Sequence, residues 1–168
     1  MNMLLHYSVL IGSGILVALQ PFGGPPPVAS VKEGRDRIIA RLKELDLPDG
    51  PIVDLGAGWG GVAEALVEAF PDREIIALEQ APIQLLFLRL RAKVHGYKVV
   101  SGNGFKLIQS GSIRPAAIVS FLNEPLMIPF ADLANHTRAA LISLRFKFSN
   151  ADGCDGDNRW RVYWKQAR

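Results

Sequence analysis

The sequence predicts an α/β fold: a doubly wound, mostly parallel sheet with helices on both faces, preceded by a hydrophobic helix. Short apolar segments of strand length alternate with longer segments whose apolar residues recur at helical spacing. The first strand segment, residues 52–55, runs directly into a glycine-rich turn and then into a helical pattern. With 168 residues, 49% of them hydrophobic, the chain can bury one core but hardly two, so we expect one main domain.

The N-terminal segment is uncharged and mostly apolar. Residues 1–31 contain no Asp, Glu, Lys or Arg, and residues 3–19 read MLLHYSVLIGSGILVAL. A bilayer span needs roughly 20 such residues, so we interpret residues 1–22 as a membrane-anchor helix. Two alternatives stay open. One is a cleaved signal peptide, which normally has a basic start and a small-residue cleavage site, and the other is a buried helix of a soluble domain.

A connector and a basic cluster follow the predicted anchor. Residues 23–29 are rich in Pro and Gly and predict an extended, semi-rigid connector, so that the main domain spans residues 30–168. Basic residues are absent before the span but follow it closely, at Lys32, Arg35, Arg37, Arg41 and Lys43. The positive-inside rule therefore predicts a single-pass membrane protein whose main domain faces the cytoplasm.

The elements of the main domain can be placed in order. Residues 30–47 predict an amphipathic helix, for which Ser30 and Glu33 form a capping box. Six strands are predicted, at residues 52–55, 74–78, 97–100, 116–122, 140–148 and 160–164. Helices are predicted between them at residues 62–70, 82–95 and 125–139, although the last contains Pro129, which a helix interior tolerates poorly. This alternation is typical of a parallel sheet covered on both faces.

Composition gives no indication of a nucleic-acid partner, an internal disulfide or a metal site. The net charge is +3 and the 19 Lys and Arg residues are scattered, so the sequence does not require a nucleic-acid partner. The single cysteine, Cys154, cannot form an internal disulfide. The acidic run DGCDGDN at residues 152–158 lacks the spacing and the closing glutamate of a calcium loop, so we expect a solvated turn and no metal site.

The segment VDLGAGWGG at residues 53–61 has the properties of a ligand-binding turn. Glycines allow a close approach of the backbone, and the start of the next helix offers free N–H groups. In an open α/β sheet, this turn lies at the carboxyl ends of the strands, where ligands bind. Glu79 ends the second strand, and an acidic side chain there can accept hydrogen bonds from ribose hydroxyls. We therefore predict an adenosine-type ligand.

Asp54 narrows the choice of cofactor. It stands two residues before Gly56 in a V-D-L-G-x-G-x-G context, which resembles motif I of the class I S-adenosylmethionine-dependent methyltransferases more than a dinucleotide fingerprint. The resemblance implies that Asp54, Gly56 and Gly58 border the methionine end of S-adenosylmethionine and that Glu79 holds its ribose. A nicotinamide or flavin nucleotide, or a turn that binds no ligand, remain as alternatives.

The same resemblance extends the set of cofactor-binding residues. Asn103, in the segment SGNGF at residues 101–105, stands where the family often has an acidic residue near the adenine amino group. An amide can still take part in such a contact. The implied cofactor site consists of Asp54, Gly56, Ala57, Gly58, Trp59, Glu79, Gln80 and Asn103.

Nearly the whole chain resembles the small membrane-anchored protein-lysine methyltransferases. The resemblance rests on the order of hydrophobic segment, FGGPPPV connector at residues 22–28, amphipathic helix and motif I. The runs ALEQAP at residues 77–82 and SLRFKF at residues 143–148 match the family's second and fifth strands. Two positions differ, because Trp59 and Asn103 stand where the family commonly has acidic residues. The resemblance implies a protein substrate, with membrane proteins among the candidates.

The turn after the fourth strand is a candidate acceptor site. Its residues Asn123, Glu124 and Pro125 faintly resemble the turn that holds an amino substrate in several methyltransferases. Asn123 can orient the acceptor nitrogen through its amide oxygen, and Glu124 can attract a cationic lysine or help to remove its proton. The alternative interpretation is a simple helix start with Pro125 at the first helical position.

Two hypotheses about function follow from the sequence. The first is a membrane-anchored methyltransferase that uses S-adenosylmethionine and acts on a protein lysine. The second is a non-catalytic module of the same fold, either a membrane-bound cofactor sensor or an assembly partner. Trp59 and Asn103 favour the second hypothesis, as does the end of the chain after six predicted strands.

Overall fold

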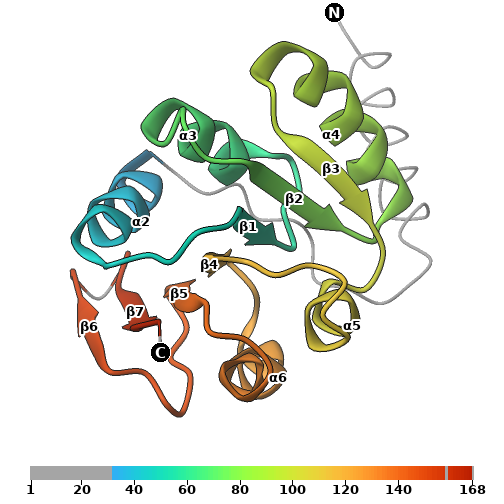
Figure 1. Cartoon of the computed structure of the whole chain (residues 1–168). Helices are drawn as coiled ribbons and strands as arrows, with labels where there is room; N and C mark the ends of the chain where they lie inside the picture. Colours follow the sequence, from blue (N-terminus) through green and yellow to red (C-terminus); the bar gives the residue numbers. More distant parts are fainter. Residues whose placement is uncertain (1–31, 158, 168) are drawn as a thin grey trace, which may run out of the picture.

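The computed structural model describes residues 32–157 and 159–167 (Figure 1). Its seven strands form one sheet in the order β3-β2-β1-β4-β5-β7-β6. The strands are β1 (Ile52–Leu55), β2 (Ile75–Glu79), β3 (Lys98–Ser101), β4 (Ala117–Ser120), β5 (Ala140–Leu144), β6 (Gly153–Asp155) and β7 (Val162–Lys165). Strands β1 to β5 are parallel, whereas β7 is antiparallel to both β5 and β6. The predicted doubly wound, mostly parallel sheet is confirmed.

Helices cover both faces of this sheet (Figure 1). The helices α2 (Lys32–Glu44), α3 (Gly61–Ala69) and α4 (Pro82–His95) contribute Ile38, Leu66 and Leu88 to the core on one face. The other face is covered by α5 (Gly104–Gln109), α6 (Met127–Asp132) and the 3-10 turns η1 (Glu124–Leu126) and η2 (Leu133–Asn135). Because both faces are covered, β1, β4 and β5 are buried along their whole length.

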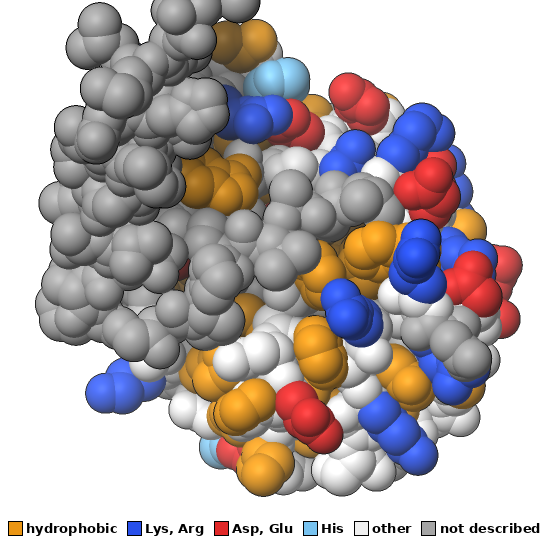
Figure 2. All heavy atoms as spheres, turned by 180° about the vertical axis from the view of Figure 1, so that it is seen from behind, with side chains coloured by type: hydrophobic (Ala, Val, Ile, Leu, Met, Phe, Trp, Pro, Cys, Tyr) orange, Lys and Arg blue, Asp and Glu red, His pale blue; other side chains and the backbone are white. Residues whose placement is uncertain are grey.

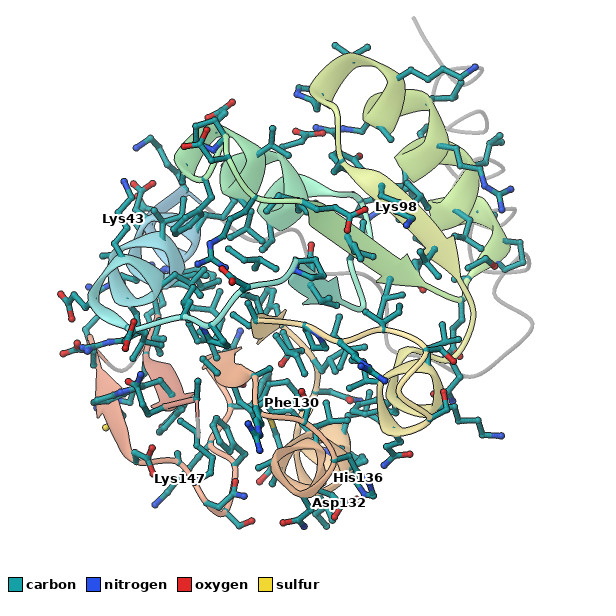
Figure 3. All side chains as sticks on the ribbon, in the orientation of Figure 1. Lys43, Lys98, Phe130, Asp132, His136 and Lys147 are labelled. Carbon is teal, nitrogen blue, oxygen red and sulfur yellow. The ribbon has the colours of Figure 1, made fainter. Side chains whose placement is uncertain are left out.

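The helix α6 shows how one amphipathic element separates core from solvent. Phe130 points towards the sheet and is fully buried, whereas Asp132, the last residue of α6, and His136, which follows η2, lie on the outer side (Figure 3). The His136 Nε2 atom lies 3.2 Å from Asp132 Oδ2. This pair is therefore an exposed surface contact, and it does not contribute to the core.

The sheet order reverses between β1 and β4. From β1 the chain continues outward through β2 and β3, and it then returns to place β4 on the other side of β1. Ligands of open α/β sheets bind at such a switch point, outside the carboxyl ends of the strands. The glycine-rich turn follows β1 and the turn with Asn123 follows β4, so the fold brings the two predicted functional segments to this point.

Two predictions near the C-terminus are wrong. The fifth strand ends at Leu144 instead of residue 148, because Arg145 has a φ of 76° and turns the chain out of the strand. The expected solvated turn at residues 152–158 contains the strand β6, which pairs with β7 through Asp155 and Val162. The sheet therefore has seven strands, and β7 lies inside the sheet and not at its edge.

Two helix predictions also need correction. The helix expected at residues 125–139 is divided into η1, α6 and η2. Pro129 lies in the first turn of α6, where backbone N–H groups have no intrahelical partner, so it is accommodated there. The helix α5 is only six residues long, which is too short for its periodicity to be recognised, and it was not predicted.

The predicted anchor (1–22) and connector (23–29) lie outside the described residues, as does Ser30 of the predicted capping box. Among the helices of the described part of the chain, none has the length and apolar character needed to cross a bilayer.

Candidate functional site

The glycine-rich turn connects the carboxyl end of β1 to α3. Gly56, Gly58 and Gly60 have φ angles of 76°, 55° and 87°, a region that side chains disfavour. A Cβ atom on Gly56 would also lie 2.5 Å from Leu122 Cδ2, and one on Gly60 would lie 2.8 Å from Tyr97 Oη. Backbone conformation therefore favours glycine at all three positions, and close packing also favours it at positions 56 and 60.

The Glu79 carboxylate holds this turn against the end of β2. Its Oε2 atom accepts a hydrogen bond from Gly58 N at 2.9 Å, while Oε1 accepts from Gln80 N at 2.7 Å and from Ala81 N at 2.9 Å. A carboxylate offers roughly four acceptor positions, so three backbone bonds leave capacity for a ligand hydroxyl. The predicted site residues Gly58, Glu79 and Gln80 are thus brought together.

Asp54 lies beneath the turn and not on its outer surface. The side chain is 3% exposed, and Oδ2 has no hydrogen-bond partner in the described part of the chain. Burial raises the pKa of Asp54 to about 7, a hydrogen bond from the Ala63 backbone opposes this rise, and the charge of Glu79 adds to it. Because Ala63 belongs to the first turn of α3, Asp54 couples the strand to the start of the helix that follows the turn.

Tyr97 is a supporting residue that the sequence analysis missed. Its hydroxyl is buried next to Gly60 and lacks a hydrogen-bond partner among the residues described. Burial, together with the nearby Glu64 carboxylate, raises the pKa of Tyr97 to about 12. Glu64 itself is paired with Arg91 of α4. No local sequence signal marks Tyr97, since only the fold places it under the turn.

Asn103 and Trp59 lie at the rim of the site. Asn103 follows β3, and its Oδ1 atom accepts a hydrogen bond from Lys106 N at 3.2 Å, which caps α5. The ring of Trp59 packs edge-on against Phe87 of α4, with ring centroids 5.1 Å apart. The backbone of Gly102 donates to Glu79 O at 3.0 Å, so the turn after β3 is connected directly to the end of β2.

The turn after β4 lies against the glycine-rich turn, because Leu122 packs on Gly56. Asn123 occupies the N-cap position of η1, but its side chain makes no capping hydrogen bond. Its Oδ1 atom is buried and unpartnered within residues 32–157 and 159–167, while Glu124 is exposed. A 3-10 helix does begin here, as the alternative interpretation predicted. The Asn123 side chain, however, makes no hydrogen bond that caps it.

The acidic residues near β6 bind separate partners. Asp152 contacts Lys165, Asp155 pairs with Arg41, and Asp157 pairs with Arg37. Within the described ranges, no group of three or more His, Cys, Asp or Glu side chains is arranged to hold a metal ion.

Several solved methyltransferases have the same arrangement. An RNA methyltransferase from Salinibacter ruber, in complex with S-adenosylhomocysteine, matches with a TM-score of 0.65 and 19% identity over 82% of this chain and 92% of that one. A 16S rRNA methyltransferase from Thermus thermophilus, in complex with S-adenosylmethionine and guanosine, matches with a TM-score of 0.62 and 14% identity over 84% and 44% of the two chains. The chain therefore has the fold of the class I S-adenosylmethionine-dependent methyltransferases.

Sequence relatives agree with this fold class. The release factor glutamine methyltransferase of Geobacter sulfurreducens is 33% identical over 82 residues, which are 49% of this chain and 28% of the relative. The malonyl-[acyl-carrier protein] O-methyltransferase of Methylococcus capsulatus is 40% identical over 58 residues, 34% and 21% of the two chains. The matched part thus spans less than a third of these relatives. No protein-family profile matches the chain.

Proposed function

We propose that this chain is an S-adenosylmethionine-dependent methyltransferase, anchored to a membrane, that methylates a lysine side chain of a protein. The position of Glu79 is the main support for the cofactor. Its carboxylate lies at the carboxyl end of β2, is bonded to the turn that follows β1, and retains acceptor capacity for a ribose hydroxyl. The bound cofactor would supply an electrophilic methyl group, and the chain's task is to place a nucleophile in line with it.

The turn after β4 supports an amino acceptor. The Asn123 Oδ1 atom is buried without a partner in the described chain, and such an atom is costly in a folded protein. A substrate N–H that binds to Oδ1 would remove this cost. Asn123 Oδ1 would then orient the acceptor nitrogen. The exposed Glu124 carboxylate would attract a lysine ammonium group and help to remove its proton.

The membrane part of the proposal is supported by the sequence of residues 1–31. A tether of this kind would keep the domain near membrane proteins, which makes their cytoplasmic lysines the preferred candidates. Lys32 and Arg41 of the basic cluster pair with acidic residues within α2. The positive-inside argument is unaffected, because it concerns insertion of the chain and not its folded contacts.

The cofactor assignment can be tested by replacing Glu79. Glu79→Ala removes charge-assisted hydrogen bonds worth about 1.5 to 3 kcal/mol, so we expect S-adenosylhomocysteine to bind roughly ten- to more than a hundredfold more weakly. Calorimetric titration measures this change. Glu74→Ala is the matched control, because Glu74 precedes the same strand at its other end and pairs with exposed Lys98. Unchanged affinity in Glu79→Ala would refute the assignment.

The anchor is tested by membrane extraction. The full chain should stay with membranes through high-salt and carbonate washes, because salt does not screen hydrophobic insertion. A chain beginning near Ser30 should appear in the supernatant. Recovery of the full chain in the soluble fraction would contradict the anchor.

Two observations favour the alternative of a non-catalytic module. Asn103 uses its Oδ1 atom to cap α5, and Trp59 packs on Phe87, at two positions where the resembling family commonly has acidic residues. A methyl-transfer assay with tritiated cofactor on membrane-protein extract separates the two functions. The enzyme should label an acceptor, whereas a non-catalytic module should bind cofactor without labelling any protein.

A further inference from the structure

The helix α4 has a second apolar face that the core does not use. Leu86, Leu90 and Val94 follow one another at intervals of one helical turn, and Phe87 lies beside them. These side chains are 60%, 55%, 81% and 46% exposed, respectively. Leu85 and Leu88, by contrast, are buried against the sheet. The exposed apolar residues therefore form one continuous face directed away from the core.

Basic side chains border this face on both sides. At 3.6 residues per turn, the exposed Arg89 and Lys93 fall on one border and Arg91 falls on the other. Arg91 is paired with Glu64, while Arg89 and Lys93 project from the exposed part of the helix surface. Viewed from behind, hydrophobic, basic and acidic side chains and a histidine lie together at the upper edge of the described surface (Figure 2). An apolar face between basic borders is typical of helices that lie in a membrane interface.

We propose that the exposed face of α4 rests on the surface of a bilayer that contains anionic lipid. The apolar side chains would enter the boundary between headgroups and acyl chains, and Arg89 and Lys93 would contact the lipid phosphates and carboxylates. This inference builds on the proposed function in one respect. An anchor followed by the seven-residue connector would keep the domain within about 22 Å of the surface if the connector is extended, so a weakly binding face is sufficient.

Charge favours an anionic bilayer over two other possible partners of this face, namely residues 1–31 and a second copy of the chain. Residues 1–31 are uncharged, so this segment offers no anionic partner to Arg89 and Lys93. In a symmetric contact with a second copy, the same basic borders would approach each other, which is unfavourable.

Docking in this way would bring the cofactor turn to the membrane surface. Phe87 belongs to the apolar face, and its ring also contacts Trp59 of the glycine-rich turn. The face and the site are therefore continuous. An acceptor lysine close to the headgroups of the same membrane would then be presented at the level of the cofactor.

Fluorescent labelling of single cysteines in the full chain tests the proposal. The exposed Cys154 is first replaced by Ser, and an environment-sensitive dye is then attached to Leu90→Cys or Val94→Cys. Lys147→Cys is the control, since Lys147 lies on the opposite side of the domain from α4 (Figure 3). The proteins are reconstituted in phosphatidylcholine vesicles with or without phosphatidylserine, and a quencher attached to the lipid chains is added.

We expect the dyes at positions 90 and 94 to lose most of their fluorescence to the lipid quencher when phosphatidylserine is present, and the dye at 147 to keep its fluorescence. Combining Arg89→Glu with Lys93→Glu should abolish this loss. Quenching by aqueous iodide alone would overturn the proposal. Protection from both quenchers would also overturn the proposal, because it would mean that protein covers this face. Protection that depends on protein concentration would indicate a second copy of the chain, whereas protection that is independent of concentration would indicate residues 1–31.

The same vesicles separate this inference from the proposed function. Flotation of the protein with the vesicles that lack phosphatidylserine reports on the anchor, and titration with S-adenosylhomocysteine reports on the cofactor site. If both succeed while positions 90 and 94 remain accessible to iodide, only the docking of α4 is refuted.

Discussion

Asn123→Ala should lower the rate of methyl transfer per folded molecule by about 10²-fold or more, because an acceptor that loses its orienting contact is rarely in line with the methyl group. S-adenosylhomocysteine should bind with nearly wild-type affinity, since Asn123 belongs to the turn after β4 and not to the cofactor turn. The measurement is a tritium-transfer assay on membrane-protein extract, with the cofactor titrated calorimetrically in parallel.

The competing explanation, that Asn123 only caps a helix, can be tested by measuring the stability of the variant. If Asn123 were a helix cap, its loss would cost about 0.5 to 2 kcal/mol of stability. Its side chain makes no capping bond, and Oδ1 is a buried, unpartnered acceptor in the described chain, so removing it should cost little stability. Thermal unfolding therefore accompanies the assay. Asn135→Ala is the control, because the exposed Asn135 side chain binds Asp132, away from the turn after β4, and should affect neither quantity. Full activity in Asn123→Ala would refute the acceptor role.

Local patterns predicted the parts of the molecule that depend on local chemistry. Gly56 and Gly58 were predicted because a strand with an acidic residue runs directly into glycines, and Glu79 was predicted because it ends the next strand. The alternation of strand-length and helix-length apolar segments predicted that most strands of the sheet are parallel. These features require only the chemistry of neighbouring residues and the topology rules for α/β sheets.

Contacts between distant segments could not be predicted in the same way. Tyr97 precedes β3, and only the fold places its hydroxyl beneath Gly60. The strand β6 has a turn-like sequence and becomes a strand through its pairing with β7. The three backbone bonds that Glu79 accepts depend on how the turn folds over β2. Such features are set by tertiary packing, which overrides local propensity.

The burial of Asp54 should appear as a pH dependence of stability. Its pKa is about 7 in the folded protein, against an ordinary value of 3.8. Between these two values the folded chain holds a proton that the unfolded chain releases. Because the folded state binds more protons, stability should fall as the pH rises from about 4 to about 7 and level off above that range. At about 1.4 kcal/mol per pH unit, the full effect is about 4 kcal/mol as an upper bound.

Asp54→Asn should remove this dependence, because an amide does not titrate. The quantity to measure is the free energy of unfolding by denaturant between pH 4 and 8, compared as the difference between variant and wild type. The difference should grow in favour of the variant with rising pH by about 1 to 4 kcal/mol, whatever constant cost the amide introduces. Asp49→Asn, at an exposed position, should give a curve parallel to the wild type. Parallel curves for Asp54→Asn as well would mean that the Asp54 carboxyl is ionised beneath the turn, with its charge stabilised by the N–H groups at the start of α3.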